Sequence, residues 1–199
     1  MSETRIGRLL AACLHQAIVD VIPERLEFYE VWLGSETLRD RGMGLAPMSA
    51  VLGFLRTEPA YALVMARGGE LAAEWTVEAI APFRRRMIDR LPRTWRTRAA
   101  LGIAAGIVRH VCSTSRASGR VRRQDARLLV TDSLFCSVRE RQALPLCGFY
   151  EAVATRTLAA FGLRAAAHIE ACHAVQGASC VIALDLSGTH AAADPALAA

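Results

Sequence analysis

The sequence predicts an α+β domain in which N-terminal helices pack on a small antiparallel sheet. Over the first two-thirds of the chain, apolar residues recur at steps of three and four, which is the period of an amphipathic helix. Over the last third, apolar and polar residues alternate on either side of Gly177, a pattern typical of a β-hairpin. With 199 residues, the chain is long enough to bury the core that such a domain needs.

Helical segments follow from this periodicity and from the positions of proline and glycine. Proline is favoured in the first turn of a helix and ends the helix before it, so Pro23 separates two helices. The pair Gly68-Gly69 predicts a break, and Gly162 predicts the end of the last helix. The expected helices cover residues 6–21, 23–33, 48–55, 70–81, 83–91, 94–111 and 145–161.

Strands are expected in the part of the chain where the alternation is clearest. One falls within residues 120–131 and two form a hairpin at about 165–172 and 179–186, with a loop or short strand over 132–143. The chain as a whole divides into a helical extension over 1–60, an α+β domain over 61–187 and a disordered tail over 188–199.

The net charge of +5 rests on 24 basic residues, and all of them are arginine. The densest basic stretch considered, residues 116–127, contains no aromatic residue and lies in no helix-turn-helix or zinc-finger pattern, so nucleic acid is not an expected partner. No apolar stretch reaches the roughly 18 residues that a membrane-spanning helix requires. The N-terminus lacks the apolar core of a secretory signal, which predicts a cytoplasmic location with reduced thiols.

Three of the six cysteines form a candidate site in the last third of the chain. A hairpin symmetric about Gln176 places Cys172 opposite Cys180, with Cβ atoms about 4.5–5.5 Å apart. Cys147 stands at the start of the preceding helix, where a thiol ionises more easily. These three thiols can ligate a metal ion, or they can pack as small hydrophobes.

Zinc is the metal that three thiolates with one carboxylate or imidazole would hold in a closed tetrahedral site. Glu170, His168 and His173 are the candidates for the fourth ligand, and the first two share a strand face with Cys172. The other three cysteines are interpreted as packing residues. They are Cys13, Cys112 and Cys136.

Two motifs of the last third resemble the vinyl-reductase-type domain. They are LPLCGFYE at residues 144–151 and IEACHAVQGASCVI at residues 169–182. Looser similarities at 69–75, 91–92, 109–110 and 118–120 look like the stand-alone bacteriochlorophyll-type members, and the resemblance as a whole covers roughly residues 65–187. The family includes a 4-vinyl reductase of bacteriochlorophyll synthesis and the sensory domains of aromatic-responsive transcription activators.

The resemblance implies a fold similar to that of vesicle-tethering subunits and haem-based nitric oxide sensors: an α+β domain, often dimeric, that encloses an apolar ligand pocket. In the aromatic-sensing members, three cysteines and a glutamate hold zinc, and Cys147, Cys172 and Cys180 match those cysteines. The family's glutamate stands three residues before the middle cysteine. This chain has Ile169 at that position, and Glu170 is its neighbour.

The expected function is to bind a hydrophobic small molecule, aromatic or tetrapyrrole-like, as a sensor, carrier or accessory protein of bacteriochlorophyll-type biosynthesis. Aromatic walls with few polar groups suit such a ligand, and an imidazole on an apolar helix can ligate a central metal or bond a ring substituent. The candidate ligand-binding residues are Trp75, Phe83, Trp95, His110, Phe135, Phe149 and Tyr150.

Two alternatives stay open, a subunit of a vinyl-group reductase and a structural adaptor. A reductase needs a hydride or electron source, but the chain shows no GxGxxG after a strand, no flavin signature and no iron–sulfur spacing, so a partner would have to supply the cofactor. A sensor of this kind reports to another protein. A homodimer is expected as well, because the helical half offers more apolar stripes than one small sheet can cover.

Overall fold

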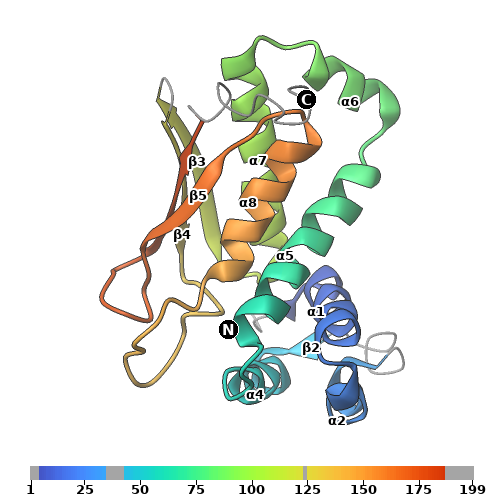
Figure 1. The fold of residues 1–199 in the computed structure, drawn as a ribbon, viewed down its shortest axis with the longest axis vertical. Coiled ribbons are helices and arrows are strands. Elements are labelled where there is room, and N and C mark those ends of the chain that lie inside the picture. Colours follow the sequence, from blue (N-terminus) through green and yellow to red (C-terminus); the bar gives the residue numbers. More distant parts are fainter. Residues whose placement is uncertain (1–4, 35–42, 123–124, 187–199) are drawn as a thin grey trace, which may run out of the picture.

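The computed structural model describes residues 5–34, 43–122 and 125–186, and it confirms the α+β class. A four-stranded antiparallel sheet lies on one side of the molecule, and helices cover one of its faces (Figure 1). The expected tail at residues 188–199 lies outside the described residues.

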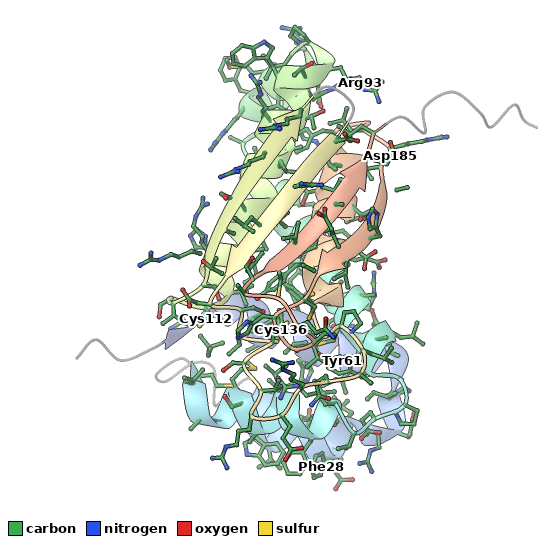
Figure 2. All side chains as sticks on the ribbon, turned by 90° about the vertical axis from the view of Figure 1, so that its left-hand side faces the viewer. Phe28, Tyr61, Arg93, Cys112, Cys136 and Asp185 are labelled. Atoms are coloured by element: carbon green, nitrogen blue, oxygen red, sulfur yellow. The ribbon has the colours of Figure 1, made fainter. Side chains whose placement is uncertain are left out.

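The alternation that predicted strands also sorts their side chains between the two faces of the sheet. The strands are β3 (Arg116–Arg122), β4 (Asp125–Thr131), β6 (Cys180–Asp185) and β5 (Ala166–Ala171), antiparallel throughout and in that spatial order. None of the described helices lies on the opposite face of the sheet, which is turned to the viewer in Figure 2. The buried residues of the two central strands are Ala126, Leu128, Val130, Cys180, Ile182 and Leu184.

Helices form the layers behind the sheet. Helices α7 (Arg93–Val111) and α8 (Gly148–Ala160) pack on the sheet, α5 (Tyr61–Glu78) packs on α8, and α1 (Arg8–Val21) packs on α5. One hydrophobic core runs from α1 to β6, and the predicted division of the chain at residue 60 stays a prediction. Helix α8 ends as predicted, because Gly162 adopts a φ of +66°, the left-handed conformation that glycine permits.

Shorter elements form the two ends of the molecule (Figure 1). One end holds a 3-10 turn (Pro23–Arg25), α2 (Leu26–Leu33), α4 (Leu45–Leu55) and the paired short strands β1 (Arg5–Ile6) and β2 (Met43–Gly44). At the other end, α6 (Pro82–Asp89) connects α5 to α7. Among the described residues, no helix combines the length and the apolar character needed to cross a membrane.

The predicted break at Gly68-Gly69 is wrong, because α5 continues through both glycines. The two residues allow α5 and α8 to approach closely. A Cβ at position 69 would lie 2.4 Å from the backbone oxygen of Phe149 and 2.8 Å from the Cβ of Ala152. The glycine pair is therefore a packing feature of a continuous helix.

Candidate functional site

Four buried cysteines meet where one end of the sheet adjoins α8. Cys136 lies in the loop after β4, and Cys147 is the N-cap residue of α8. Cys172 directly follows β5, and Cys180 is the first residue of β6. Their sulfur atoms all lie within 4.8 Å of one another, and none of the four residues is more than 5% exposed. Figure 2 shows Cys136 at this end of the sheet, where the loops meet the helices.

The spacing of the sulfur atoms suits a tetrahedral metal ion. The Sγ atom of Cys136 lies 3.5 Å from that of Cys172 and 3.4 Å from that of Cys180. Zinc–sulfur bonds of about 2.3 Å at tetrahedral angles place sulfur atoms about 3.8 Å apart. All four thiols are free, because their separations are far longer than the roughly 2.05 Å of a disulfide bond. The four cysteines could therefore bind one metal ion.

The β5–β6 hairpin positions two of these thiols. Ala171 pairs with Val181, so the next step toward the loop brings Cys172 opposite Cys180, as the alternation predicted. The carbonyl oxygen of Cys172 accepts backbone hydrogen bonds that close the turn, and this geometry holds the two cysteines at the same end of the sheet. The donors are the N–H groups of Val175, Gln176 and Gly177.

Glu170, the predicted carboxylate ligand, does not lie with the thiols. The register shifts between Ile169 and Ala171, and Ile169 pairs with Ile182, the partner expected for Glu170. The carboxylate of Glu170 instead forms an ion pair with Arg127 on the exposed side of the sheet, with 3.0 Å between Oε2 and Nε. The physical reason is the bulge, which leaves this side chain on the solvent face.

The fourth sulfur comes from Cys136, which sequence analysis assigned to packing. Neither imidazole of the two histidine candidates joins the thiol group. His168 is exposed on β5, and Nδ1 of His173 lies 2.9 Å from the carbonyl oxygen of Gly177. One sequence signal bears on Cys136: Ile169 stands where the family that the motifs resemble has a glutamate, and Cys136 is the remaining cysteine near those motifs.

The thiols differ in acidity. Hydrogen bonding with Cys136 and Cys147 lowers the pKa of the Cys180 thiol to about 3, even though burial opposes ionisation. The hydrogen bond with Cys136 and burial raise the pKa of Cys147 well above its ordinary range. A thiolate at Cys180, beside the raised pKa values of Cys136 and Cys147, would give a metal cation one ligand that is already deprotonated.

Three of the predicted ligand-binding residues form a closed aromatic cluster beside the thiols. Phe135, Phe149 and Tyr150 are fully buried, and their ring centroids lie 4.9, 5.1 and 6.0 Å apart. Ser133 Oγ donates a hydrogen bond to the hydroxyl oxygen of Tyr150 at 3.2 Å. The rings pack on one another and on the core. They line neither the groove between α5, α6 and α7 nor the hollow near the end of β4.

An apolar groove of about 650 Å³ lies between α5, α6 and α7. Gly102 and Gly106 of α7 lie on its wall, where a Cβ at position 102 would meet no atom within 4 Å. The volume falls in the roughly 300–1,000 Å³ range of small-molecule sites. The aliphatic walls come mainly from Ile80, Ile88, Ile103 and Ile107.

His110 is the predicted ligand-binding residue that lines this groove. Its Nδ1 lies 2.7 Å from the carbonyl oxygen of Gly106. A carbonyl oxygen only accepts, so Nδ1 donates in this hydrogen bond and Nε2 is the ring nitrogen left to interact with a ligand. The other predicted residues lie elsewhere: Trp75 is half-buried against the core, while Phe83 and Trp95 are 74% and 60% exposed.

A second hollow, also of about 650 Å³, lies near the end of β4 and has a different character. Thr114, Asp132, Ser133 and His173 are among its lining residues, so hydroxyl, carboxylate and imidazole groups face it. A hydrophobic ligand would have to desolvate these groups, which makes the groove between α5, α6 and α7 the better apolar site.

Two solved structures share the fold. The crystal structure of the phenol-responsive sensory domain of the transcription activator PoxR with phenol matches with a TM-score of 0.53 at 13% identity, over 72% of this chain and 75% of that chain. An H-NOX protein from S. oneidensis in the Fe(II) ligation state matches with a TM-score of 0.51 at 12% identity, over 91% and 96%. No protein-family model matches the chain, and no curated protein matches its sequence. At these identities the likeness defines the fold alone.

Proposed function

We propose that the protein binds a hydrophobic small molecule in the groove between α5, α6 and α7, and that a zinc ion on four cysteines stabilises the domain. The observation that carries the binding function is the groove itself, with its aliphatic walls and one available imidazole. The two solved structures that share the fold support it, since one is a phenol-responsive sensory domain and the other an H-NOX protein in a defined iron ligation state.

The groove favours a planar, apolar ligand. The bare backbone at Gly102 and Gly106 offers a flat contact surface, and isoleucine side chains supply the surrounding hydrophobic contacts. Nε2 of His110 can accept a hydrogen bond or ligate a metal at the centre of a ring system. An aromatic or tetrapyrrole-like compound meets these requirements, in a sensor, carrier or accessory protein of bacteriochlorophyll-type synthesis. Membership of the vinyl-reductase-type family stays a prediction, and so does the homodimer.

The binding proposal is tested by titrating the protein with protoporphyrin IX and following the quenching of tryptophan fluorescence. Gly106→Leu fills the groove and should raise the dissociation constant at least about tenfold, as loss of a few buried contacts would. Gly53→Leu, on the exposed side of α4 where a Cβ meets nothing within 4 Å, is the matched control and should leave binding unchanged. Equal binding by all three proteins would place the ligand elsewhere.

The zinc proposal is tested by measuring metal content after purification in a chelator-free buffer. We expect one zinc ion per chain in the wild type and none in Cys136→Ser, because a hydroxyl replaces one of four thiolates. Cys13→Ser is the control, since Cys13 is equally buried but lies outside the thiol group. Zinc retained by Cys136→Ser would mean that the ion is bound by other residues.

A further inference from the structure

Residues 82–98, which comprise α6 and the first part of α7, form a strongly basic segment. Seven arginines and one aspartate give this segment a net charge of +6, while the whole chain has +5, so the remaining residues together carry −1. The arginines are Arg84, Arg85, Arg86, Arg90, Arg93, Arg96 and Arg98.

Large apolar side chains are exposed in the same segment. Phe83 is 74% exposed, Met87 55%, Leu91 38% and Trp95 60%. Phe83 and Met87 are four residues apart in α6 and therefore share one side of that helix. Ile88 is the buried residue of α6, so the helix packs through a narrow contact and presents most of its apolar surface to solvent.

The segment forms one end of the molecule. Figure 1 shows α6 and the start of α7 at the end opposite α2 and α4, and Figure 2 shows Arg93 at the same end. Three of these arginines contact neutral groups. Arg93 donates to the carbonyl oxygen of Leu186, Arg96 donates to that of Asp89, and the Arg98 guanidinium lies 5.4 Å from the centre of the Trp95 ring.

We propose that this end of the molecule, residues 82–98, docks on the surface of an anionic lipid bilayer. Exposed Phe, Met, Leu and Trp side chains gain free energy by entering the interfacial region, where tryptophan is especially favoured. Arginines beside them pair with lipid phosphates while their aliphatic stems stay in the apolar layer. The two properties occur together here, and a bilayer surface with negative headgroups satisfies both at once.

Two other partners fit this surface less well. Single-stranded nucleic acid is bound by arginine and stacking aromatic rings, but Met87 and Leu91 cannot stack on bases. A second copy of the chain would bring two segments of charge +6 face to face, which costs electrostatic free energy. Both partners are included as outcomes of the test.

Docking would also place the groove beside the bilayer, a step that rests on the proposed function. Helix α6 contributes Arg84 and Ile88 to the groove and exposes Phe83 and Met87 on its free surface. A hydrophobic ligand concentrates in the bilayer, so a docked molecule would meet its ligand at the point of entry.

The test is flotation of the full chain with vesicles of phosphatidylcholine, with and without phosphatidylglycerol. The wild type should float with the anionic vesicles, and increased salt should weaken this binding. Arg85→Glu/Arg86→Glu and Phe83→Ser/Met87→Ser should each lower the partition coefficient at least about tenfold. The four residues are exposed, so the variants should fold normally, and circular dichroism checks that they do.

Matched controls separate this surface from general charge and hydrophobicity. Arg139→Glu/Arg141→Glu changes two exposed arginines of the loop after β4, and Leu63→Ser/Leu144→Ser removes two exposed leucines, 65% and 74% exposed, elsewhere on the molecule. Both controls should float like the wild type. Gly106→Leu should also float, so that failure of ligand binding and failure of docking are distinguishable.

Several results would overturn the proposal. They are equal binding to neutral vesicles, equal loss in the control variants, tighter binding to single-stranded DNA than to anionic vesicles, and self-association that Phe83→Ser/Met87→Ser abolishes. A blue shift of the tryptophan emission on adding anionic vesicles, lost in Trp95→Phe, would support insertion at this end of the chain.

Discussion

At the scale of single residues, the thiol group shows how one side chain can replace another in a site. The bulge in β5 turns Glu170 to solvent. The loop after β4 brings Cys136 to the thiol group as its fourth member, the role that was expected of Glu170. The result is a set of four thiols from the loop after β4, the start of α8, the end of β5 and the start of β6. Because all four candidate donors are sulfur atoms, a metal bound there would be a soft or borderline one such as zinc, and magnesium or calcium is disfavoured.

Replacing Glu170 by Gln should therefore leave the zinc content unchanged. The substitution removes only the ion pair with Arg127, whose two side chains are 60% and 40% exposed, so the free energy of unfolding should fall by less than about 1 kcal/mol. Metal analysis and chemical denaturation measure the two quantities. Loss of zinc in this variant would show that Glu170 reaches the metal in solution.

The position of Cys136 could not be predicted from its sequence context. Alternation located Cys172 and Cys180, since register follows from the pattern of a hairpin. Cys136 and Cys147 lie at the two ends of a segment without helix or strand, and only packing against the rest of the molecule determines its path. A spacing rule cannot supply that information.

At the scale of helices and strands, α5 packs closely on α8 at Gly69. Gly69→Ala should lower the free energy of unfolding by about 1–3 kcal/mol, because the new methyl group overlaps a backbone oxygen of α8 that cannot move alone. Gly53→Ala is the control. There the added Cβ meets nothing, and higher helix propensity should raise stability by about 0.5–1 kcal/mol.

Urea denaturation of both variants checks this prediction. A neutral or stabilising effect at position 69 would mean that the two helices can separate without cost, which contradicts the tight contact. The example also explains why the sequence suggested a break. Glycine pairs occur both at chain breaks and at close helix contacts, and the neighbour that distinguishes the two cases is far away in sequence.

At the scale of the whole molecule, the thiol group joins the sheet, α8 and the loop between β4 and α8. Removing zinc with a strong chelator should loosen that loop first, because Cys136 and Cys147 anchor its two ends. Trypsin should then cleave after Arg139 or Arg141 at least about tenfold faster, while cleavage after Arg120 in β3 should change little. Mass spectrometry of the fragments identifies the sites.

Uniform acceleration at all arginines would instead indicate that metal removal unfolds the entire domain. Unchanged cleavage would indicate that no metal stabilises the loop. Faster cleavage in the loop alone, faster cleavage at all arginines and unchanged cleavage are distinct results. The experiment therefore shows whether a bound metal stabilises only the loop, the whole domain or neither.

The fold class was predictable from periodicity alone, but the position of the apolar groove was not. Aromatic residues were expected to line a pocket, yet Phe149 and Tyr150 are core residues and Trp95 is exposed. Composition identifies which side chains are large and apolar. It does not say whether they face one another, a cavity or solvent, because that depends on how α5, α6 and α7 are placed around the core.

Helix α6 gives the two proposed binding events a thermodynamic connection. The groove uses Arg84 and Ile88, and the free surface of the same short helix bears Phe83 and Met87. If ligand binding shifts this helix, linkage requires that ligand and bilayer change each other's affinity by the same factor. The fraction of the protein bound to the bilayer would then depend on whether a ligand fills the groove. Helix α6 would couple the two binding events.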